Sequence, residues 1–332
     1  MMPARPGSLP FFKRRSQKIS SWRFSSIYAK FVESACVFFS IEVTMTDNIE
    51  VEHLEAHDGA QLYCQHYPAK DERGVIITVH DYGQHSGAYE AAHQLLVDGH
   101  FGVYTMDLRG HGRSAGERAA IEHFDDYLED LDLLIARVKD RQEEKPLFLL
   151  GQGMGALIAL RYVTTRRSTF HGLILCGGLP LLPIHSKERL ISQYAGILLN
   201  HIKANNEARE ILLAPSLIGA LKDDELSFRG DIKARTVAQI NAANAFVNEG
   251  QEFLGFPVLC LASERHHILM ERIHNKILTH DKTLIDYEGQ SLQPLLGEER
   301  REVSQEIVKW CNEHLEKIDD EDEWGDPEDD SL

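Results

Sequence analysis

The stretch LFLLGQGMGALIA at residues 147–159 decides the fold. An apolar run of strand length leads into three alternating glycines, Gly151, Gly153 and Gly155, and an apolar stretch of helical character follows. A strand, sharp turn and helix of this kind normally display a serine at the centre of the turn. The central residue here is Gly153, which has no side chain with which to attack a substrate.

Strand patterns and helix patterns alternate on either side of this turn. Short aliphatic or β-branched runs occur at 74–80, 102–108, 146–151, 172–178, 257–263 and 283–289. Apolar positions at helical spacing follow most of them, most clearly at 123–140 and 301–318. The alternation predicts an α/β fold with a mainly parallel central sheet and helices on both faces. Residues of about 180–250 carry no strand pattern, which predicts a helical cap inserted into that fold.

Composition narrows the class of function. The 332 residues are 43% hydrophobic and carry a formal net charge of −17, which repels phosphate backbones at long range. We therefore expect no nucleic-acid partner. The cysteines, Cys36, Cys64, Cys176, Cys260 and Cys311, lack CxxC spacing, so neither a disulfide framework nor a metal site is indicated. We expect no cofactor and a reducing, cytoplasmic location.

The two ends differ from the patterned domain at 47–317. Residues 1–46 form a basic extension without acidic residues up to position 32, which is either a mitochondrial transit segment or an unstructured extension ahead of a second start at Met45. The apolar piece at 31–43 is shorter than the roughly 20 residues that span a bilayer, so no transmembrane segment is expected. Residues 318–332 form an acidic run that predicts a disordered tail.

The chain from about 48 to 316 resembles the monoglyceride lipase and lysophospholipase group of α/β-hydrolases, which is related to the serine aminopeptidase type. Four segments carry the resemblance, in the order and spacing of that group: HDYGQHSGAY at 80–89, DLRGHGRSAGER at 107–118, GQGMGALIA at 151–159 and YEGQSLQPLL at 287–296. The resemblance implies an α/β-hydrolase fold with a helical cap, and hydrolysis of a carboxylic ester by serine, histidine and acid.

All three catalytic positions are changed. The resemblance places the serine at Gly153, the acid at His266, or at Arg265 or His267 if the alignment moves by one residue, and the histidine at Leu292. Glycine cannot attack, and leucine cannot carry a proton. Loss of the three groups typically lowers the catalytic rate about a million-fold. The remaining enzyme is then only roughly a thousand-fold faster than the uncatalysed reaction in water.

The oxyanion loop is changed as well, while the structural motifs are kept. The resemblance places the oxyanion donors at Tyr82 and Met154, and Asp81 replaces the glycine of the motif. We expect the bulky Tyr82 side chain to fill space once used by a substrate carbonyl. Gln84 and Ala88 replace a glutamate and an arginine that would hold a glycerol head group. The retained motif residues, to which we assign structural roles, are His80, Gly83, Asp107, Arg109, Gly110, His111, Gly112, Gly151 and Gly155.

Three interpretations of function stay open. The first is a non-catalytic homologue, a pseudoenzyme that binds a lipid-like molecule under the cap or serves as a protein-interaction module. The second is a weak or relocated-site hydrolase of carboxylic esters, acylglycerols or lysophospholipids, whose candidate residues are His85, Ser86, Glu264 and His266, with Cys176 or Ser263 as a substitute nucleophile. The third places a protein partner on the acidic tail, where Trp324 is an aromatic anchor among carboxylates.

Overall fold

The computed structural model describes residues 44–46, 49–142, 144–166, 170–180, 203–204, 206–213, 219–249, 252–263, 266–287 and 293–323. Two units are distinguished along the chain, Met1–Ser40 and Ile41–Leu332, and every described residue belongs to the second. The basic extension up to residue 43, Leu292 and Trp324 therefore lie outside the described residues.

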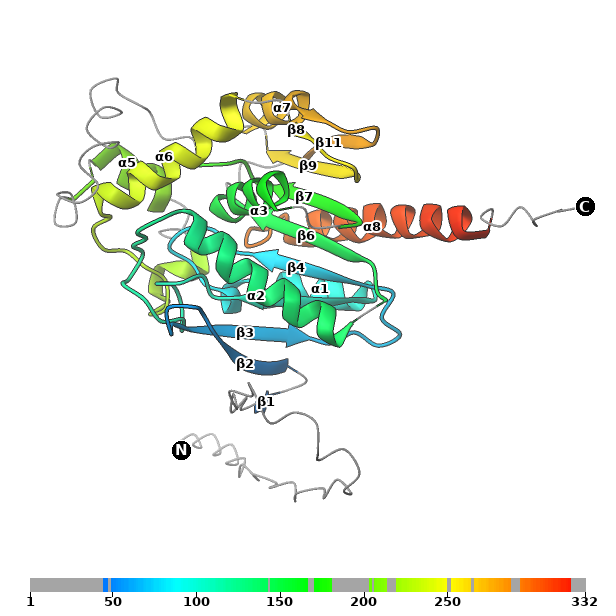
Figure 1. Cartoon of the computed structure of the whole chain (residues 1–332), viewed down its shortest axis with the longest axis horizontal. Coiled ribbons are helices and arrows are strands. Elements are labelled where there is room, and N and C mark those ends of the chain that lie inside the picture. The colour runs from blue at the N-terminus through cyan, green and yellow to red at the C-terminus, as the bar shows by residue number, and fades with distance from the viewer. Residues whose placement is uncertain are drawn as a thin grey trace, which may run out of the picture. The chain divides into compact units, whose positions relative to one another are not determined.

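A nine-stranded sheet forms the centre of the described domain, in the order β1-β2-β3-β5-β4-β6-β7-β9-β11 (Figure 1). β1, β2 and β3 run antiparallel at one edge, and the strands from β5 to β11 are parallel to one another. The strands are β1 (Thr44–Thr46), β2 (Ile49–Glu55), β3 (Gln61–Tyr67), β4 (Gly74–Val79), β5 (Phe101–Met106), β6 (Leu147–Gln152), β7 (Gly172–Cys176), β9 (Val258–Ser263) and β11 (Lys282–Tyr287). A separate parallel pair joins β8 (Glu252–Phe253) and β10 (Ile277–Leu278).

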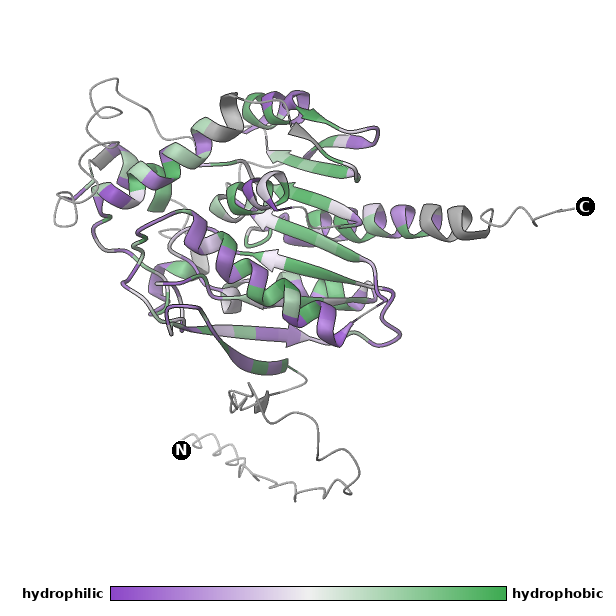
Figure 2. Cartoon of the chain, in the orientation of Figure 1, coloured by the Kyte–Doolittle hydropathy of each residue, from purple (hydrophilic) through white to green (hydrophobic). Residues whose placement is uncertain are grey.

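Helices cover both faces of the sheet because successive strand residues point to opposite faces. Val75 and Ile77 pack with α2 (Asp125–Arg141), α3 (Met154–Thr165) and α7 (His267–Lys276) in one buried cluster. Ile76 packs with α1 (Glu90–Asp98) and α8 (Arg300–Glu323) in another. Figure 2 shows the central strands as predominantly hydrophobic, in keeping with burial on both faces. The predicted α/β fold with a mainly parallel sheet is confirmed.

Each of the six strand predictions falls on a strand of the central sheet. The antiparallel edge made by β1, β2 and β3 was not predicted. β1 has only three residues, and the β2 and β3 sequences, IEVEHLE and QLYCQHY, mix polar with apolar residues and so lack the continuous apolar runs of the central strands. Helix α8 begins close to the predicted position and continues to Glu323, inside the acidic segment that starts at 318.

Between β7 and β8 the described elements are α5 (Asn206–Leu213), the 3-10 helix η4 (Gly219–Asp223) and α6 (Ala234–Glu249), with an isolated bridge between Lys203 and Lys233. The boundaries of the cap, the extension at 1–46 and the disordered tail stay predictions. None of the described helices is both long enough and apolar enough to cross a membrane.

Candidate functional site

The turn after β6 brings strand and helix together through glycine. Gly153 joins β6 to α3 with φ 58° and ψ −118°, a conformation that residues with a Cβ adopt only at a cost of about 1 to 3 kcal/mol. A Cβ on Gly151 would overlap the backbone of Gly155, and a Cβ on Gly155 would overlap the carbonyl of Val79 at the end of β4. The glycines thus let α3 approach closely the carboxyl ends of the central strands β4 and β6.

The carboxylate of Asp81 occupies the space in front of this turn. Its Oδ1 accepts hydrogen bonds from the backbone N–H of Tyr82 and from that of Met154, both at 2.7 Å. Its Oδ2 accepts a bond of 3.0 Å from the Nε2 of Gln293. Tyr82 and Met154 are the residues at which the resemblance places the oxyanion donors, so an internal carboxylate takes the place of a substrate oxygen.

Burial and hydrogen bonding act in opposite directions on Asp81. Removal from water raises the pKa of its carboxyl to about 6, and the bonds from the N–H groups of Met154 and Tyr82 and from Gln293 limit the rise. With that pKa the carboxyl group is mostly ionised at pH 7, and its two oxygens accept three hydrogen bonds. The three donors are neutral, so among the described residues no charge of opposite sign is bonded to this carboxylate.

Tyr82 lies elsewhere than the sequence led us to expect. Its ring is fully buried against α2, and its Oη donates a bond of 2.5 Å to the carbonyl of Ala119. The expectation that the Tyr82 side chain fills the substrate space is wrong, because the backbone at Tyr82 aims the ring into the core and only its N–H toward the turn. Asp81 fills that space instead.

Two motif histidines hydrogen-bond to the backbone. His80 donates from Nδ1 to the carbonyl of Asp81 at 2.8 Å and accepts at Nε2 from the N–H of Leu108 at 2.9 Å. His111 pairs through Nδ1 with the carbonyl of Arg109 at 3.0 Å. Burial lowers the pKa of both imidazoles to about 3, so both are neutral at pH 7. They hold the loops beside the site and have no charge to contribute.

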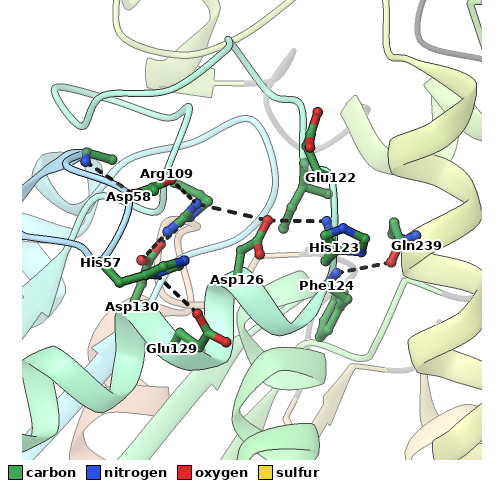
Figure 3. Close-up of polar contacts among 12 residues, drawn as sticks. His57, Asp58, Arg109, Glu122, His123, Phe124, Asp126, Glu129, Asp130 and Gln239 are labelled. Carbon is green, nitrogen blue, oxygen red and sulfur yellow. Dashed lines mark hydrogen bonds and ion pairs between the residues drawn. The ribbon is translucent and has the colours of Figure 1, made fainter. Parts of the chain in front are cut away.

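Arg109 ties the second motif to α2 (Figure 3). Its Nε and Nη2 each lie 2.6 Å from a carboxylate oxygen of Asp130, which is fully buried, and its Nη1 lies 3.1 Å from Asp58. The hydrogen bonds to Asp130 raise the pKa of the guanidinium. In the same loop Gly110 and Gly112 take positive φ, and Asp107 accepts bonds from the N–H groups of Ser86 and Arg113 at 2.7 Å each.

The oxyanion loop also contacts the cap. His85 Nε2 lies 2.5 Å from Oδ2 of Asp224, and the N–H of Phe228 donates to the carbonyl of Gly83 at 2.7 Å. His85 is buried, and its Nδ1 has no partner among the described residues. Hydrogen bonds from His85 and from the backbone of Leu226 outweigh burial and lower the pKa of Asp224. The pair joins two segments that are distant in sequence.

Of the positions assigned to the acid and the base, the structure describes His266 but not Leu292. His266 caps the start of α7, and its Nδ1 lies 3.4 Å from the Oγ of Ser263 at the end of β9. Its ring lies against Gly178, which follows β7. Leu292 lies outside the described residues, and the next residue in the sequence, Gln293, donates a hydrogen bond to Asp81 at the turn. His267 pairs instead with Asp286 on the surface.

The other candidate nucleophiles are enclosed. Cys176 and Ser263 are fully buried at the ends of β7 and β9, and burial raises the pKa of the Cys176 thiol far above its usual range. Ser86 Oγ lies 2.6 Å from Asp107 Oδ1 and 2.8 Å from Gln65 Oε1. Glu264 lies outside the described residues. Within the described part of the chain, no group of three metal-ligating side chains was found.

The parallel sheet, the helices on both faces and the glycine turn after β6 define an α/β-hydrolase fold. The chain belongs to the serine aminopeptidase S33 family, whose pattern matches residues 70–291, and within it to the monoglyceride lipase-like group. Monoglyceride lipase of Mus musculus is 27% identical over 80% of this chain and 91% of its own length. Monoacylglycerol lipase of Mycolicibacterium smegmatis is 23% identical over 82% of this chain and 100% of its own.

Solved structures show the same fold. A carboxyl esterase from Bacillus coagulans superposes with a TM-score of 0.70 at 18% identity, over 81% of this chain and 100% of that protein. Monoacylglycerol lipase of Paleococcus ferrophilus superposes with a TM-score of 0.62 at 24% identity, over 76% and 99%. The fold and family predicted from the four motifs are thus confirmed.

Sequence reasoning missed two residues of the site. Asp81 was recognised as replacing a glycine, but not as the occupant of the oxyanion position. Gln293 was not singled out. The sequence did contain a signal for Asp81. This carboxylate precedes Tyr82, an expected N–H donor, and the turn carries Gly153, which has no side chain to occupy the site. No comparable signal marked Gln293, because its partner lies 212 positions away in the sequence.

Proposed function

We propose that this chain is a non-catalytic member of the monoglyceride lipase-like group that acts as a binding module for a lipid-like ligand or a protein partner. One observation carries the proposal: the Asp81 carboxylate accepts hydrogen bonds from both N–H groups that would otherwise stabilise a developing oxyanion. Gly153 supplies no nucleophile behind it. The relatives named as lipases support a lipid-like ligand class, since they act on glycerol esters by their names.

Rate arguments point the same way. A hydrolase without its triad keeps roughly a thousand-fold over water from the oxyanion hole and from binding. Here the hole faces a carboxylate, and a second negative charge on a tetrahedral intermediate would be repelled by it. Even the residual catalysis of a damaged hydrolase is therefore expected to be absent.

Purified protein tests this proposal through two readouts. Intact mass after incubation with a fluorophosphonate probe should show no saturable adduct, and short-chain p-nitrophenyl esters should turn over no faster than with heat-denatured protein. A saturable adduct, or turnover above the denatured control, would overturn the proposal.

A relocated ester hydrolase is the alternative, and the His85–Asp224 pair is the observation in its favour. The carboxylate orients an imidazole whose Nδ1 has no partner among the described residues, which is the arrangement of a general base. Esterase activity that disappears in His85→Gln and persists in His57→Gln, a change at an exposed histidine, would establish this function.

The tail remains a separate proposal. Trp324 would place an aromatic anchor among acidic side chains that suit a basic groove on a partner. Truncation after Glu323 keeps α8 intact and removes Trp324. A set of co-purified proteins that is identical for the full chain, the truncation and Trp324→Ala would dispose of the idea.

A further inference from the structure

Two backbone N–H groups at the turn donate hydrogen bonds to the carboxylate of Asp81. Tyr82 and Met154 are both fully buried, and their N–H groups donate to the same oxygen of Asp81 at 2.7 Å. Buried N–H groups are almost always paired, because an unpaired one loses its bonds to water without compensation. Asp81 therefore satisfies the donors that this fold builds for a substrate oxygen.

The same side chain fills the volume that Gly153 leaves. A Cβ built on Gly153 would overlap all three carboxyl atoms of Asp81. The carboxylate thus stands where a side chain at position 153 would stand, although it comes from the loop after β4 and not from the turn after β6. A single residue fills both the nucleophile position and the oxyanion position.

A third segment closes around this carboxylate. Gln293, which is 6% exposed, donates its amide to Oδ2 at 3.0 Å. Gln152 accepts a bond of 3.1 Å from the N–H of Leu295 and donates one of 2.9 Å to the Tyr89 hydroxyl, which in turn accepts from the N–H of Asp81 at 3.2 Å. The loop after β4, the turn and the segment after Leu292 are therefore bonded to one another around Asp81.

We propose that Asp81 is an intramolecular ligand whose carboxylate closes the oxyanion hole to acyl carbonyl and carboxylate groups. The loops themselves keep the open arrangement: both N–H groups still converge on one oxygen, and the Tyr82 ring is directed to Ala119, away from the turn. A lipid-like ligand of this protein then binds without placing a carbonyl in the hole. The inference rests on the proposed function in treating these donors as unused by catalysis.

Backbone amide spectra of ¹⁵N-labelled, deuterated protein titrated with sodium acetate test this inference. Asp81→Gly restores the glycine of the family motif and removes the obstacle, whereas Asp81→Asn keeps the shape and one acceptor oxygen. We expect saturable shifts of the Tyr82 and Met154 amide signals in Asp81→Gly, with a Kd at least about tenfold lower than in the wild type or Asp81→Asn. Absence of such shifts in a folded Asp81→Gly, or equal shifts in the wild type, would overturn the inference.

A measurement on the wild type keeps the inference testable if Asp81→Gly fails to fold. The Tyr82 and Met154 amide signals should move together with pH as the carboxylate is protonated, and should not move in Asp81→Asn. The adjacent His80 stays neutral as Asp81 titrates, because burial lowers the pKa of this imidazole to about 3. Burial raises the pKa of the nearby Tyr89 and Cys176 far above that of Asp81, so these groups stay protonated. Amide signals that are independent of pH would contradict the assignment. Esterase assays address the proposed function separately, so failure of one does not imply failure of the other.

Discussion

The Asp81 carboxylate lies against the α-carbon of Gly153, so tightly that a Cβ at position 153 would overlap it. The two residues are therefore mutually dependent: the aspartate is accommodated because the turn carries glycine, and any larger residue at the turn requires the aspartate to leave. The glycine at position 153 and the carboxylate at position 81 are thus structurally coupled, although they are 72 positions apart in the sequence.

Gly153→Ser should destabilise the fold, and Asp81→Gly should relieve part of the loss. The serine adds strain at positive φ and overpacking against Asp81, each about 1 to 3 kcal/mol. Only the overpacking disappears in the double variant, so a double-mutant cycle in urea should give a favourable coupling of about 1 kcal/mol or more.

Gly59→Ser provides the matched control for that cycle. Gly59 also has positive φ, but a Cβ there meets nothing within 4 Å. Its strain should therefore add to the effect of Asp81→Gly without coupling. Equal coupling for Gly59 and Gly153 would show that Asp81 does not occupy the turn.

Asp81→Asn should stabilise the protein at neutral pH. Burial raises the folded-state pKa of Asp81 from 3.8 to about 6, so the stability linked to this group is fully present below pH of about 4 and is lost as the pH rises through about 6. The neutral amide avoids that loss, which amounts to about 3 kcal/mol at most above pH 7. Urea unfolding of both proteins between pH 4 and 8 measures the difference.

Asp58→Asn supplies a control of opposite sign. A hydrogen bond from the N–H of Ala60 and the charge of Arg109 outweigh burial and lower the pKa of Asp58, so its contribution is present above the unfolded-state pKa and is lost as the pH falls. The amide should therefore cost stability at neutral pH and cost less in acid. The same pH trend in both variants would refute the assignment for Asp81.

The central sheet was readable from sequence because strands buried on both faces are continuous apolar runs, as in 146–151 and 257–263. The direction of the Asp81 side chain was not readable. It depends on the space left at Gly153 and on Gln293, which the chain brings in from a distance of more than 200 residues. Bulk made Tyr82 the natural candidate to fill the site, but the backbone sends that ring into the core.

The motif around Arg109 was also recognised without its partner. Asp130 lies 21 residues away on α2. The many charged residues of this helix predict a solvent-exposed face, and nothing in the sequence distinguishes Asp130 as buried. Breaking a buried ion pair from one side typically costs about 3 to 5 kcal/mol, so Asp130→Ala should lower the free energy of unfolding by that amount. Glu129→Ala, one residue earlier and paired with His57 on the surface, should cost less than about 1 kcal/mol. Similar urea midpoints for the two variants would contradict this account.

The His85–Asp224 bond should control how firmly the cap holds the oxyanion loop. Asp224→Asn removes the negative charge from a bond of 2.5 Å and weakens the neighbouring contact of Phe228 N–H with Gly83. A hydrogen bond to a charged group contributes about 1.5 to 3 kcal/mol, which corresponds to exchange of the Phe228 amide hydrogen roughly ten-fold faster or more. Asp223→Asn changes the exposed neighbour and should leave that rate unchanged. If the Phe228 amide exchanges at the same rate in both variants, contacts other than the His85–Asp224 pair hold the cap. His85 would then also be excluded from a relocated mechanism, because the Asp224 carboxylate that orients its ring would contribute nothing measurable.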